Sequence, residues 1–430
     1  MEKFFKLKAN GTTVRTELVA GLTTFMTMAY ILAVNPATLA AAGMDKGALF
    51  TATALSSLVA TLMMALYANL PFALAPGMGL NAFFAYTVVL AMGYPWELAL
   101  TAVFVEGIIF ILLSIFKIRE AIVRAIPLNI RRAVSVGIGL FIAFIGLQNA
   151  KIIVSNPAVL VGLGDITKGP ALLALIGLVL TGALLAFKVK GALLIGILGT
   201  TVIGIPMGIT AIPQGFSPLA MPASLSPILF KFQFDKLLTL DFFVVMFSFL
   251  FVDMFDTIGT LVGVSTKAKM ISSDGTMPRM NRALMSDAVG TVFGACIGTS
   301  TVTTYVESAA GVSEGGRTGL TALSTAGLFF VALFLSPIFL LIPGAATAPA
   351  LILVGLFMME PIKDIDLSDY TEAIPAFLAI IMMPLTYSIA DGIMFGIMGY
   401  AIIKVCSGKW KDVPVPTFIL AVLFVLKLVL

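Results

Sequence analysis

Apolar runs follow one another along nearly the whole chain, separated by short polar connections. Seven lie before residue 209, at 18–33, 48–69, 71–94, 97–116, 131–148, 170–188 and 191–208. Seven more lie after residue 238, at 240–265, 283–298, 299–315, 319–340, 345–359, 374–387 and 389–405. We interpret each as one membrane segment, since an apolar helix of about 20 residues spans the hydrocarbon core of a bilayer. The pattern therefore predicts an all-α polytopic membrane protein with fourteen segments, and the last run, 417–430, fits a further span or an interfacial helix.

An odd number of segments in each half gives the two halves opposite orientations in the membrane. The first predicted repeat is 1–208, a connection with four prolines covers 209–238, and the second, inverted repeat is 239–430. Inverted repeats are typical of secondary transporters, whose substrate sites lie at the interface between the repeats.

Two of the predicted segments are interrupted. Pro and Gly interrupt one at 71–81 (PFALAPGMGLN), and a Thr-rich stretch leading to Glu307 interrupts another at 298–311 (GTSTVTTYVESAAG). Irregular backbone at membrane depth is tolerated only where it is buried in protein or lines a cavity, and paired interruptions point to a binding site. We therefore predict that the two interruptions meet at a substrate site that includes Gly79, Asn81 and Glu307. The glycines of the first stretch would equally serve close helix packing.

The stretch Phe249–Thr260 (FLFVDMFDTIGT) places two carboxylates in an apolar run with no Lys or Arg near them. On a helix, Asp253, Asp256 and Thr260 share one face. An ionised Asp at the centre of a bilayer costs roughly 2.5 to 3.5 kcal/mol, so these acids imply protons, water or a ligand as partners. Together with Glu307 they accept hydrogen bonds and repel anions. The predicted ligand is therefore neutral or cationic and rich in N–H donors.

Other residues have both a functional and a structural interpretation. Glu106 lies inside a span and either takes part in proton coupling or hydrogen-bonds a neighbouring helix. Asp287 lies near a span end, where we expect it to cap a helix or to pair with Arg282. Aromatic side chains beside the polar groups either stack on a planar ligand or pack in the core: Phe83, Phe84, Phe255 and Tyr305.

Composition agrees with the apolar pattern and orients it. The chain is 60% hydrophobic and only 11% charged, with a mean hydropathy of +1.09, which excludes a soluble domain. Twenty Lys and Arg lie in connections on the side of the N-terminus, against five on the other side. The positive-inside rule then places the N-terminus in the cytoplasm. The net charge of +4 follows from this topology and gives no indication of nucleic acid binding.

Cysteine and histidine usage removes several classes of chemistry. The chain has two cysteines, without metal-ligand spacing, and no histidine. We therefore expect no disulfide framework, no metal site, no cofactor and no Ser-His-Asp catalysis. Carboxylates are left as the proton carriers.

Several long motifs, in order along the chain, resemble one transporter family. The motifs are GLTTFMTMAYILAVNP, APGMGLNAFFAY, IGLFIAFIGLQNA, FVDMFDTIGTLVGV and GTSTVTTYVESAAGVSEGGRTGL. They are similar to those of the AzgA-like purine permease branch (adenine, guanine, hypoxanthine) of the nucleobase-ascorbate transporter superfamily, and the similarity covers nearly the whole chain.

This resemblance implies the uracil-permease fold, with a core domain from segments 1–4 and 8–11, a gate domain from segments 5–7 and 12–14, and short strands in segments 3 and 10. It places the family's segment 8 acid on Asp253 or Asp256, the segment 10 glutamate on Glu307, and the segment 3 Gly and Asn on Gly79 and Asn81. Other branches carry a histidine four residues after the segment 8 acid. In this chain the residue four positions after Asp256 is Thr260, so a histidine proton relay is absent.

We expect a proton-coupled importer of purine nucleobases in the cytoplasmic membrane, not an enzyme. Glu307 and one segment 8 aspartate would bind the base, and the same acids would couple its uptake to protonation. Sodium coupling and a homodimer stay open, as do pyrimidine, xanthine, ascorbate or another small polar solute as substrate. A remote alternative is an intramembrane aspartyl protease, because GLGD occurs at 162–165 and Phe-Asp at 255–256. The order of these elements is, however, the reverse of the protease order.

Overall fold

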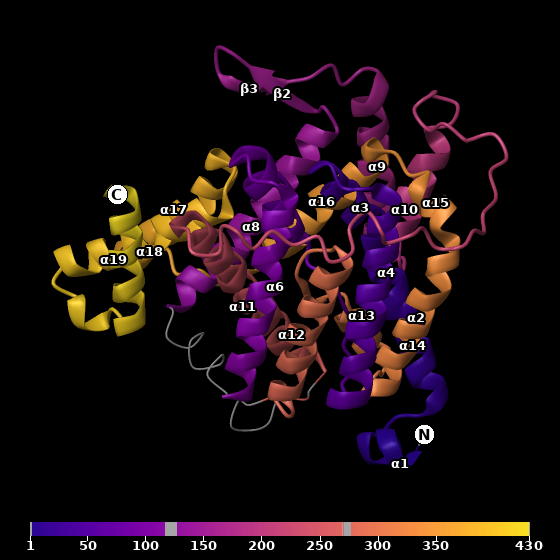
Figure 1. Ribbon diagram of the computed structural model, residues 1–430, viewed down its shortest axis with the longest axis horizontal. Coiled ribbons are helices and arrows are strands. Elements are labelled where there is room, and N and C mark those ends of the chain that lie inside the picture. Colours follow the sequence, from indigo (N-terminus) through magenta and orange to yellow (C-terminus); the bar gives the residue numbers. More distant parts are fainter. Residues whose placement is uncertain (1, 117–126, 269, 271–276, 430) are drawn as a thin grey trace.

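The computed structural model describes residues 2–116, 127–268, 270 and 277–429. The first half contains, in order, α1 (Glu2–Phe5), η1 (Lys8–Asn10), α2 (Val14–Met28), α3 (Ile31–Ala40), α4 (Lys46–Met63), η2 (Met64–Ala68), β1 (Leu74–Pro76), α5 (Met78–Ala82), η3 (Phe83–Ala91), α6 (Trp96–Ile115), α8 (Leu128–Asn149), β2 (Ile153–Asn156), β3 (Leu160–Leu163), α9 (Gly169–Ala186) and α10 (Ala192–Ile203). The helices pack side by side as one bundle (Figure 1).

The second half is also helical. It contains α11 (Leu240–Lys267), α12 (Met280–Ile297), β4 (Val302–Thr304), α13 (Ser308–Ser313), α14 (Gly319–Ala332), η4 (Leu333–Leu335), α15 (Ser336–Leu340), α16 (Gly344–Met358), η5 (Glu360–Asp364), α17 (Tyr370–Thr386), α18 (Ile389–Cys406), η6 (Trp410–Asp412) and α19 (Val415–Val429).

These elements match the predicted membrane segments. In the described part of the chain, nine helical spans are long and apolar enough to cross a membrane, and three shorter apolar helices cover Met78–Ala91, Ala192–Ile203 and Tyr370–Thr386. The α12 helix and the β4–α13 pair supply the remaining two. The prediction of a polytopic helical membrane protein is confirmed. The 15-residue α19 is shorter than a typical span.

Local sequence signals set several helix ends. The Thr13 hydroxyl accepts the Thr16 N–H at the start of α2, and the Asp45 carboxylate accepts the Ala48 N–H at the start of α4. Such side-chain caps satisfy amides that have no partner inside the helix. After α5 the chain continues as the π-helical η3, a rare form that is frequent at functional sites.

The two interrupted segments meet, as predicted. Strands β1 and β4 pair antiparallel, with Leu74 opposite Thr304, Ala75 opposite Thr303 and Pro76 opposite Val302. The pairing is extended by hydrogen bonds from the Gly77 N–H to the Thr301 carbonyl and from the Tyr305 N–H to the Ala73 carbonyl. Both strands are buried. The backbone N–H and C=O groups of the two strands bond each other. The break in the helices therefore leaves few backbone polar groups without a hydrogen-bond partner inside the membrane.

A second strand pair lies in a connection where we predicted none. The β2–β3 hairpin pairs Ile153 with Leu163 and projects from one end of the bundle (Figure 1). The GLGD sequence falls at its end, and Asp165 forms an exposed ion pair with Lys168 at 3.1 Å. The protease hypothesis is therefore wrong. An aspartyl protease needs two aspartates together in its active site, whereas the Asp165 carboxyl is exposed at the surface of a connection.

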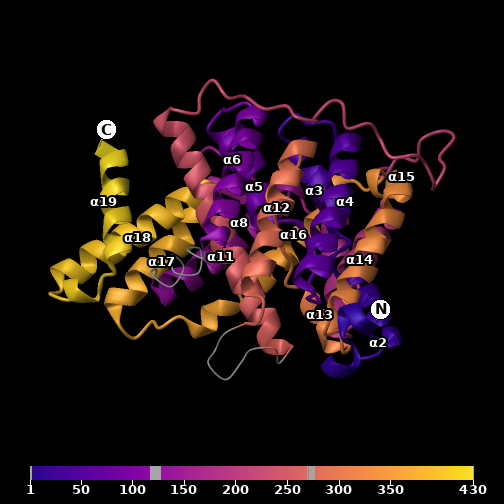
Figure 2. The same ribbon diagram turned by 60° about the horizontal axis from the view of Figure 1, so that its bottom comes forward.

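The helices contact one another in two groups. In one group α14 contacts α2 and α4, while α12 contacts α4 and α6, and α6 also contacts α11. In the other, α8 contacts α16 and α17, α9 contacts α10 and α16, and α17 contacts α18. Figure 2 shows α17, α18 and α19 at one side of the molecule and α2, α4 and α14 at the other.

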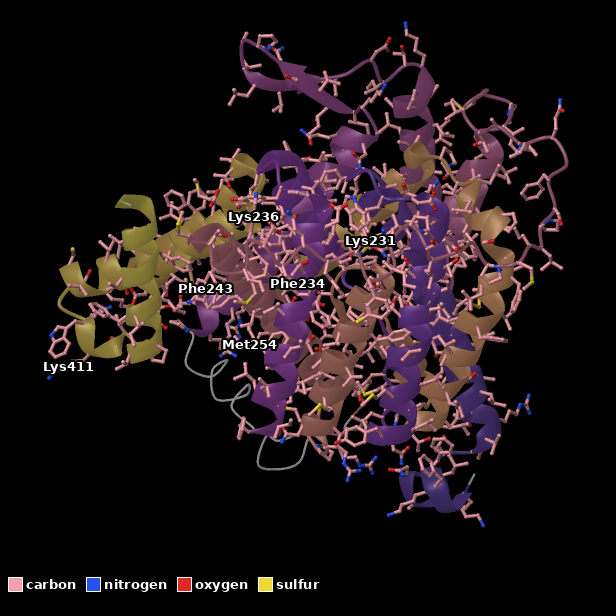
Figure 3. The ribbon with its side chains drawn as sticks, viewed as in Figure 1. Lys231, Phe234, Lys236, Phe243, Met254 and Lys411 are labelled. Atoms are coloured by element: carbon pink, nitrogen blue, oxygen red, sulfur yellow. The ribbon has the colours of Figure 1, made fainter. Side chains whose placement is uncertain are left out.

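The connection between the halves runs across one end of the bundle, and α1 lies at the other end (Figures 1 and 2). Lys231 and Lys236 belong to this connection, while Lys411 lies beside α19 at the edge of the molecule (Figure 3).

Candidate functional site

The candidate site is built where β1, β4 and the short helices after them meet α2, α3 and α11. Glu307 follows β4 and directly precedes α13. Its carboxylate accepts a hydrogen bond from the Tyr30 hydroxyl at 2.7 Å. Tyr30 lies at the break between α2 and α3 and is buried. The first and tenth segments are therefore joined at the predicted segment 10 glutamate.

Asp256 on α11 faces the same place. It interacts electrostatically with Glu307 and Asp287, and with the hydroxyl groups of Tyr30 and Tyr305. Among the residues that the structure describes, no Lys or Arg forms an ion pair with Asp256 or Glu307. Two carboxyl groups and two phenolic hydroxyls thus share one largely buried volume.

Asp253 belongs to a neighbouring polar cluster around Thr257. The Thr257 hydroxyl lies 2.9 Å from Asp253 Oδ1, 3.0 Å from Asp287 Oδ1 and 2.7 Å from the Thr303 hydroxyl. Asp253, Asp287, Thr257 and Thr303 are buried. The expectation that Asp287 caps a helix end or pairs with Arg282 is wrong. Asp287 lies inside α12 in contact with α11, and the Arg282 guanidinium donates to the Tyr67 carbonyl.

Glu106 on α6 belongs to a third buried contact. Its carboxylate accepts a hydrogen bond of 2.9 Å from the Thr301 hydroxyl, directly before β4. The side chain is fully buried. This agrees with the structural interpretation, in which the acid bonds a neighbouring segment, and it connects α6 to the interrupted tenth segment.

Asn81 and Gly79 have packing roles in this structure. The Asn81 side-chain oxygen accepts a hydrogen bond from the Ser300 hydroxyl, and its amide group donates to the Pro76 carbonyl at 3.4 Å. A methyl group at Gly79 would lie 2.7 Å from the Ile138 side chain on α8, so glycine permits this close approach. Binding of a ligand by Asn81 stays a prediction, and it would require exchange of these internal bonds.

The aromatic candidates lie in two different places in the structure. The Tyr305 hydroxyl donates to the Pro76 carbonyl at 2.5 Å, so this ring joins β4 to β1 beside Glu307. Phe83 and Phe84 both pack near Phe249, with ring centroids 4.8 and 6.3 Å away. The side chain of Phe255 lies outside the described residues.

The chemistry of the site follows from its groups. Carboxylates accept hydrogen bonds and tyrosine hydroxyls donate or accept them, so the site suits a small neutral or cationic ligand that carries N–H donors. In the described part of the chain, no group of three or more His, Cys, Asp or Glu is arranged to hold a metal ion.

Sequence reasoning did not identify Tyr30, Thr257, Asp287 or Thr303 as members of this region. A signal was present for Tyr30, which lies in GLTTFMTMAYILAVNP, one of the motifs that carry the family resemblance. Asp287 was missed because its place near a span end suggested an exposed cap.

Comparison with known proteins agrees with these features. Residues 15–395 match the Permease family. A guanine/hypoxanthine permease of Bacillus subtilis is 45% identical over 437 residues, covering 99% of each chain. An adenine permease of Escherichia coli is 43% identical over 430 residues, covering 100% of this chain and 96% of the relative. A protein of Methanocaldococcus jannaschii is 50% identical over 429 residues, covering 100% of this chain and 98% of the relative.

The fold has solved relatives too. The transmembrane domain of a cyanobacterial bicarbonate transporter superposes with a TM-score of 0.66 at 18% identity, covering 88% of this chain and 97% of that domain. This likeness supports the predicted uracil-permease-like fold. The chain is a multi-pass membrane protein of the Permease family, in the purine permease branch of the nucleobase-ascorbate transporter superfamily.

Proposed function

We propose that this protein imports purine nucleobases across the cell membrane by symport with protons. The observation that carries the proposal is the placement of Asp256 and Glu307, with Tyr30, at the crossing of the two interrupted segments. Purine bases present ring and exocyclic N–H groups, which carboxylates accept. The names of the relatives, permeases for adenine and for guanine and hypoxanthine, support this substrate class.

In this mechanism Glu307 and Asp256 bind the base. A carboxylate has about four lone-pair positions, so Glu307 retains acceptor capacity beyond its bond from Tyr30. Gly79 and Asn81 would shape the opposite wall from the third segment. Tyr305, which holds β4 against β1, fixes the direction in which the Glu307 backbone leaves the strand.

Coupling would use the cluster around Thr257. A hydroxyl has one hydrogen, so Thr257 donates to only one of Asp253 and Asp287 at a time. Two buried carboxyl groups in such a place favour a state in which one of them carries a proton. Asp253 and Asp287 would therefore load and release the proton, with Asp256 and Glu307 linked to them by electrostatic interaction. Glu106, bonded to the segment before β4, would respond to the same movement.

The two groups of contacting helices suggest how the substrate would cross. We assign segments 1–4 and 8–11, including β1 and β4, to a core that carries the site, and segments 5–7 and 12–14 to a gate. The repeats would be 1–208 and 239–430. Movement of the core against the gate would expose the site alternately to the two sides. The excess of Lys and Arg at the end that carries α1 assigns this end to the cytoplasm.

Uptake in a purine-uptake-deficient host tests the function. Cells that produce the protein should accumulate radiolabelled hypoxanthine, guanine or adenine, with uracil competing poorly. A proton uncoupler should abolish accumulation, and removal of sodium from the external medium should leave accumulation unchanged. Uptake of uracil without any purine would contradict the substrate class, and dependence on sodium would contradict proton coupling.

A further inference from the structure

A cavity whose lining does not include Glu307 lies between the proposed core and gate. It has a volume of about 230 Å³ and is lined by η3, the beginning of α11 and the turn that joins α17 to α18. The α11 helix begins at the end of the bundle where the connection between the halves runs, opposite α1 (Figure 2). The cavity is therefore on the side that the topology assigns to the outside.

The wall of this cavity combines one carboxylate with hydroxyl groups and apolar side chains. Asp391, Ser388 and Thr87 supply the polar groups, and Phe83 supplies an aromatic wall. Among the residues that the structure describes, no Lys or Arg forms an ion pair with Asp391. An acidic acceptor beside an aromatic ring suits a planar, neutral ligand with N–H donors and does not suit an anion.

The turn that forms one side of the cavity is held by both parts of the molecule. The Tyr387 hydroxyl donates to Gln148 Oε1 at 2.6 Å, on α8. The Thr87 hydroxyl, on η3, donates to the Tyr387 carbonyl at 2.9 Å. Tyr387 has a left-handed backbone, with φ of +58°, which turns the chain sharply between α17 and α18. The turn therefore places Asp391 in a fixed position opposite Phe83.

The size of the cavity restricts the ligand. Pockets for drug-sized ligands have roughly 300–1,000 Å³, and this cavity is smaller. Its size therefore suits a compact ligand such as a free base.

We propose that this cavity is an entrance site, at which a purine nucleobase from outside binds before it reaches Glu307, with Asp391 accepting its N–H groups. The inference rests on the proposed function and adds a second binding position on the same route. A base held at this place would be released toward the crossing of β1 and β4 when the core moves against the gate.

Protection of an introduced thiol tests the site directly. Cys296 and Cys406 are free thiols, so both are first replaced by Ala, and Ala390→Cys is then added beside Asp391. We expect hypoxanthine, guanine or adenine to slow modification of Cys at 390 by a membrane-impermeant thiol reagent at least threefold, and inosine to have no effect. A Cys introduced at Ser217, in the connection between the halves, serves as the unprotected control.

Two further variants separate the entrance site from the site at Glu307. In a Glu307→Gln background, purine protection of the thiol should persist, because the entrance cavity does not include Glu307. Addition of Asp391→Asn should raise the purine concentration needed for half-protection at least fivefold, whereas Asp165→Asn should not. Loss of protection with Glu307→Gln, or unchanged protection with Asp391→Asn, would overturn the entrance site. Failure of the parent protein to take up any purine would instead contradict the proposed function.

Discussion

Within the described part of the chain, Glu307 is held by a neutral donor and not by a basic side chain. The Tyr30 hydroxyl bonds one carboxylate oxygen at 2.7 Å, and Asp256 is near enough to interact with it electrostatically. Hydrogen bonds that involve a charged group contribute about 1.5–3 kcal/mol. In the proposed site Glu307 bonds the base directly, whereas Tyr30 acts on the base through Glu307, so substitutions at these two residues should have different magnitudes.

Replacement of Glu307 by Gln should weaken purine binding. The loss of a charged acceptor corresponds to an increase in Kd of about tenfold to a hundredfold. Equilibrium binding of radiolabelled base to the purified protein measures this change. Glu314→Gln is a matched control, because Glu314 lies in the same segment but pairs with Lys190 at 2.7 Å away from the site. An unchanged Kd for Glu307→Gln would remove Glu307 from the binding site.

Replacement of Tyr30 by Phe should have a smaller effect through the same carboxylate. Only part of the contribution of this hydrogen bond should reach the base, so we expect roughly a twofold to tenfold increase in Kd. Because Tyr30 acts through Glu307, the two substitutions should not be additive, and Tyr30→Phe should change little in the Glu307→Gln protein. Tyr400→Phe, whose hydroxyl donates to the Asp412 carbonyl near the end of α18, is the control. Full additivity would indicate that Tyr30 contacts the base independently.

At the scale of elements, a buried carboxylate joins α2 to α14. Glu17 accepts hydrogen bonds from the Arg317 N–H at 2.9 Å, and from the amides and hydroxyls of Thr318 and Thr321. These amides lie at the beginning of α14, where helical N–H groups have no partner inside the helix. One side chain of the first segment therefore caps the eleventh segment.

Glu17→Ala should lower the stability of the protein without changing its affinity for the base. It leaves several buried donors without an acceptor, and each such group costs about 1–3 kcal/mol. We expect a lower Tm in detergent and less folded protein, with purine affinity of the remaining folded protein within about twofold of the parent. Thr13→Ala removes the exposed cap of α2 and should have a much smaller effect. A Tm equal to that of the parent would show that water replaces the carboxylate.

At the scale of the whole molecule, we expect binding and coupling to fall on different side chains. Asp256 interacts electrostatically with Asp287 and Glu307, while Asp253 shares the Thr257 hydroxyl with Asp287. Asp253→Asn should therefore keep purine affinity within about threefold but abolish the dependence of accumulation on external pH. Uptake at several pH values, together with equilibrium binding, measures both. Wild-type pH dependence in this variant would place coupling elsewhere.

Movement between core and gate can be tested by restraint. The hydrogen bond from Thr87 to the Tyr387 carbonyl joins η3 to the α17–α18 turn. In the protein without Cys296 and Cys406, a bifunctional reagent that forms a disulfide with each thiol and so joins Thr87→Cys to Ser388→Cys should stop transport, and reduction of these disulfides should restore it. The control pair is Asp369→Cys with Lys409→Cys, whose native side chains form an ion pair at 3.0 Å within the gate. Transport by the first cross-linked protein would contradict the proposed movement.

The sequence by itself determined the segments, the two interruptions and the acids. Bilayer thickness fixes the length of an apolar span. The Pro and Gly of 71–81 and the Thr-rich stretch of 298–311 favour irregular backbone, which at membrane depth is tolerated only where it is buried in protein or lines a cavity. These are local properties, and for this reason they could be predicted. The meeting of β1 with β4 was predicted from the paired interruptions in the two inverted repeats, since binding sites lie at the interface between such repeats.

Only the tertiary structure decided which groups meet. Asp253 and Asp256 are about 60° apart around a helix with 3.6 residues per turn, so the rotation of α11, set by packing against α6, α12 and β4, decides which of them faces Glu307. Tyr30 lies 277 residues from Glu307, and Thr257 lies 30 residues from Asp287. No periodicity within one segment records such pairings, because they depend on how separate helices pack.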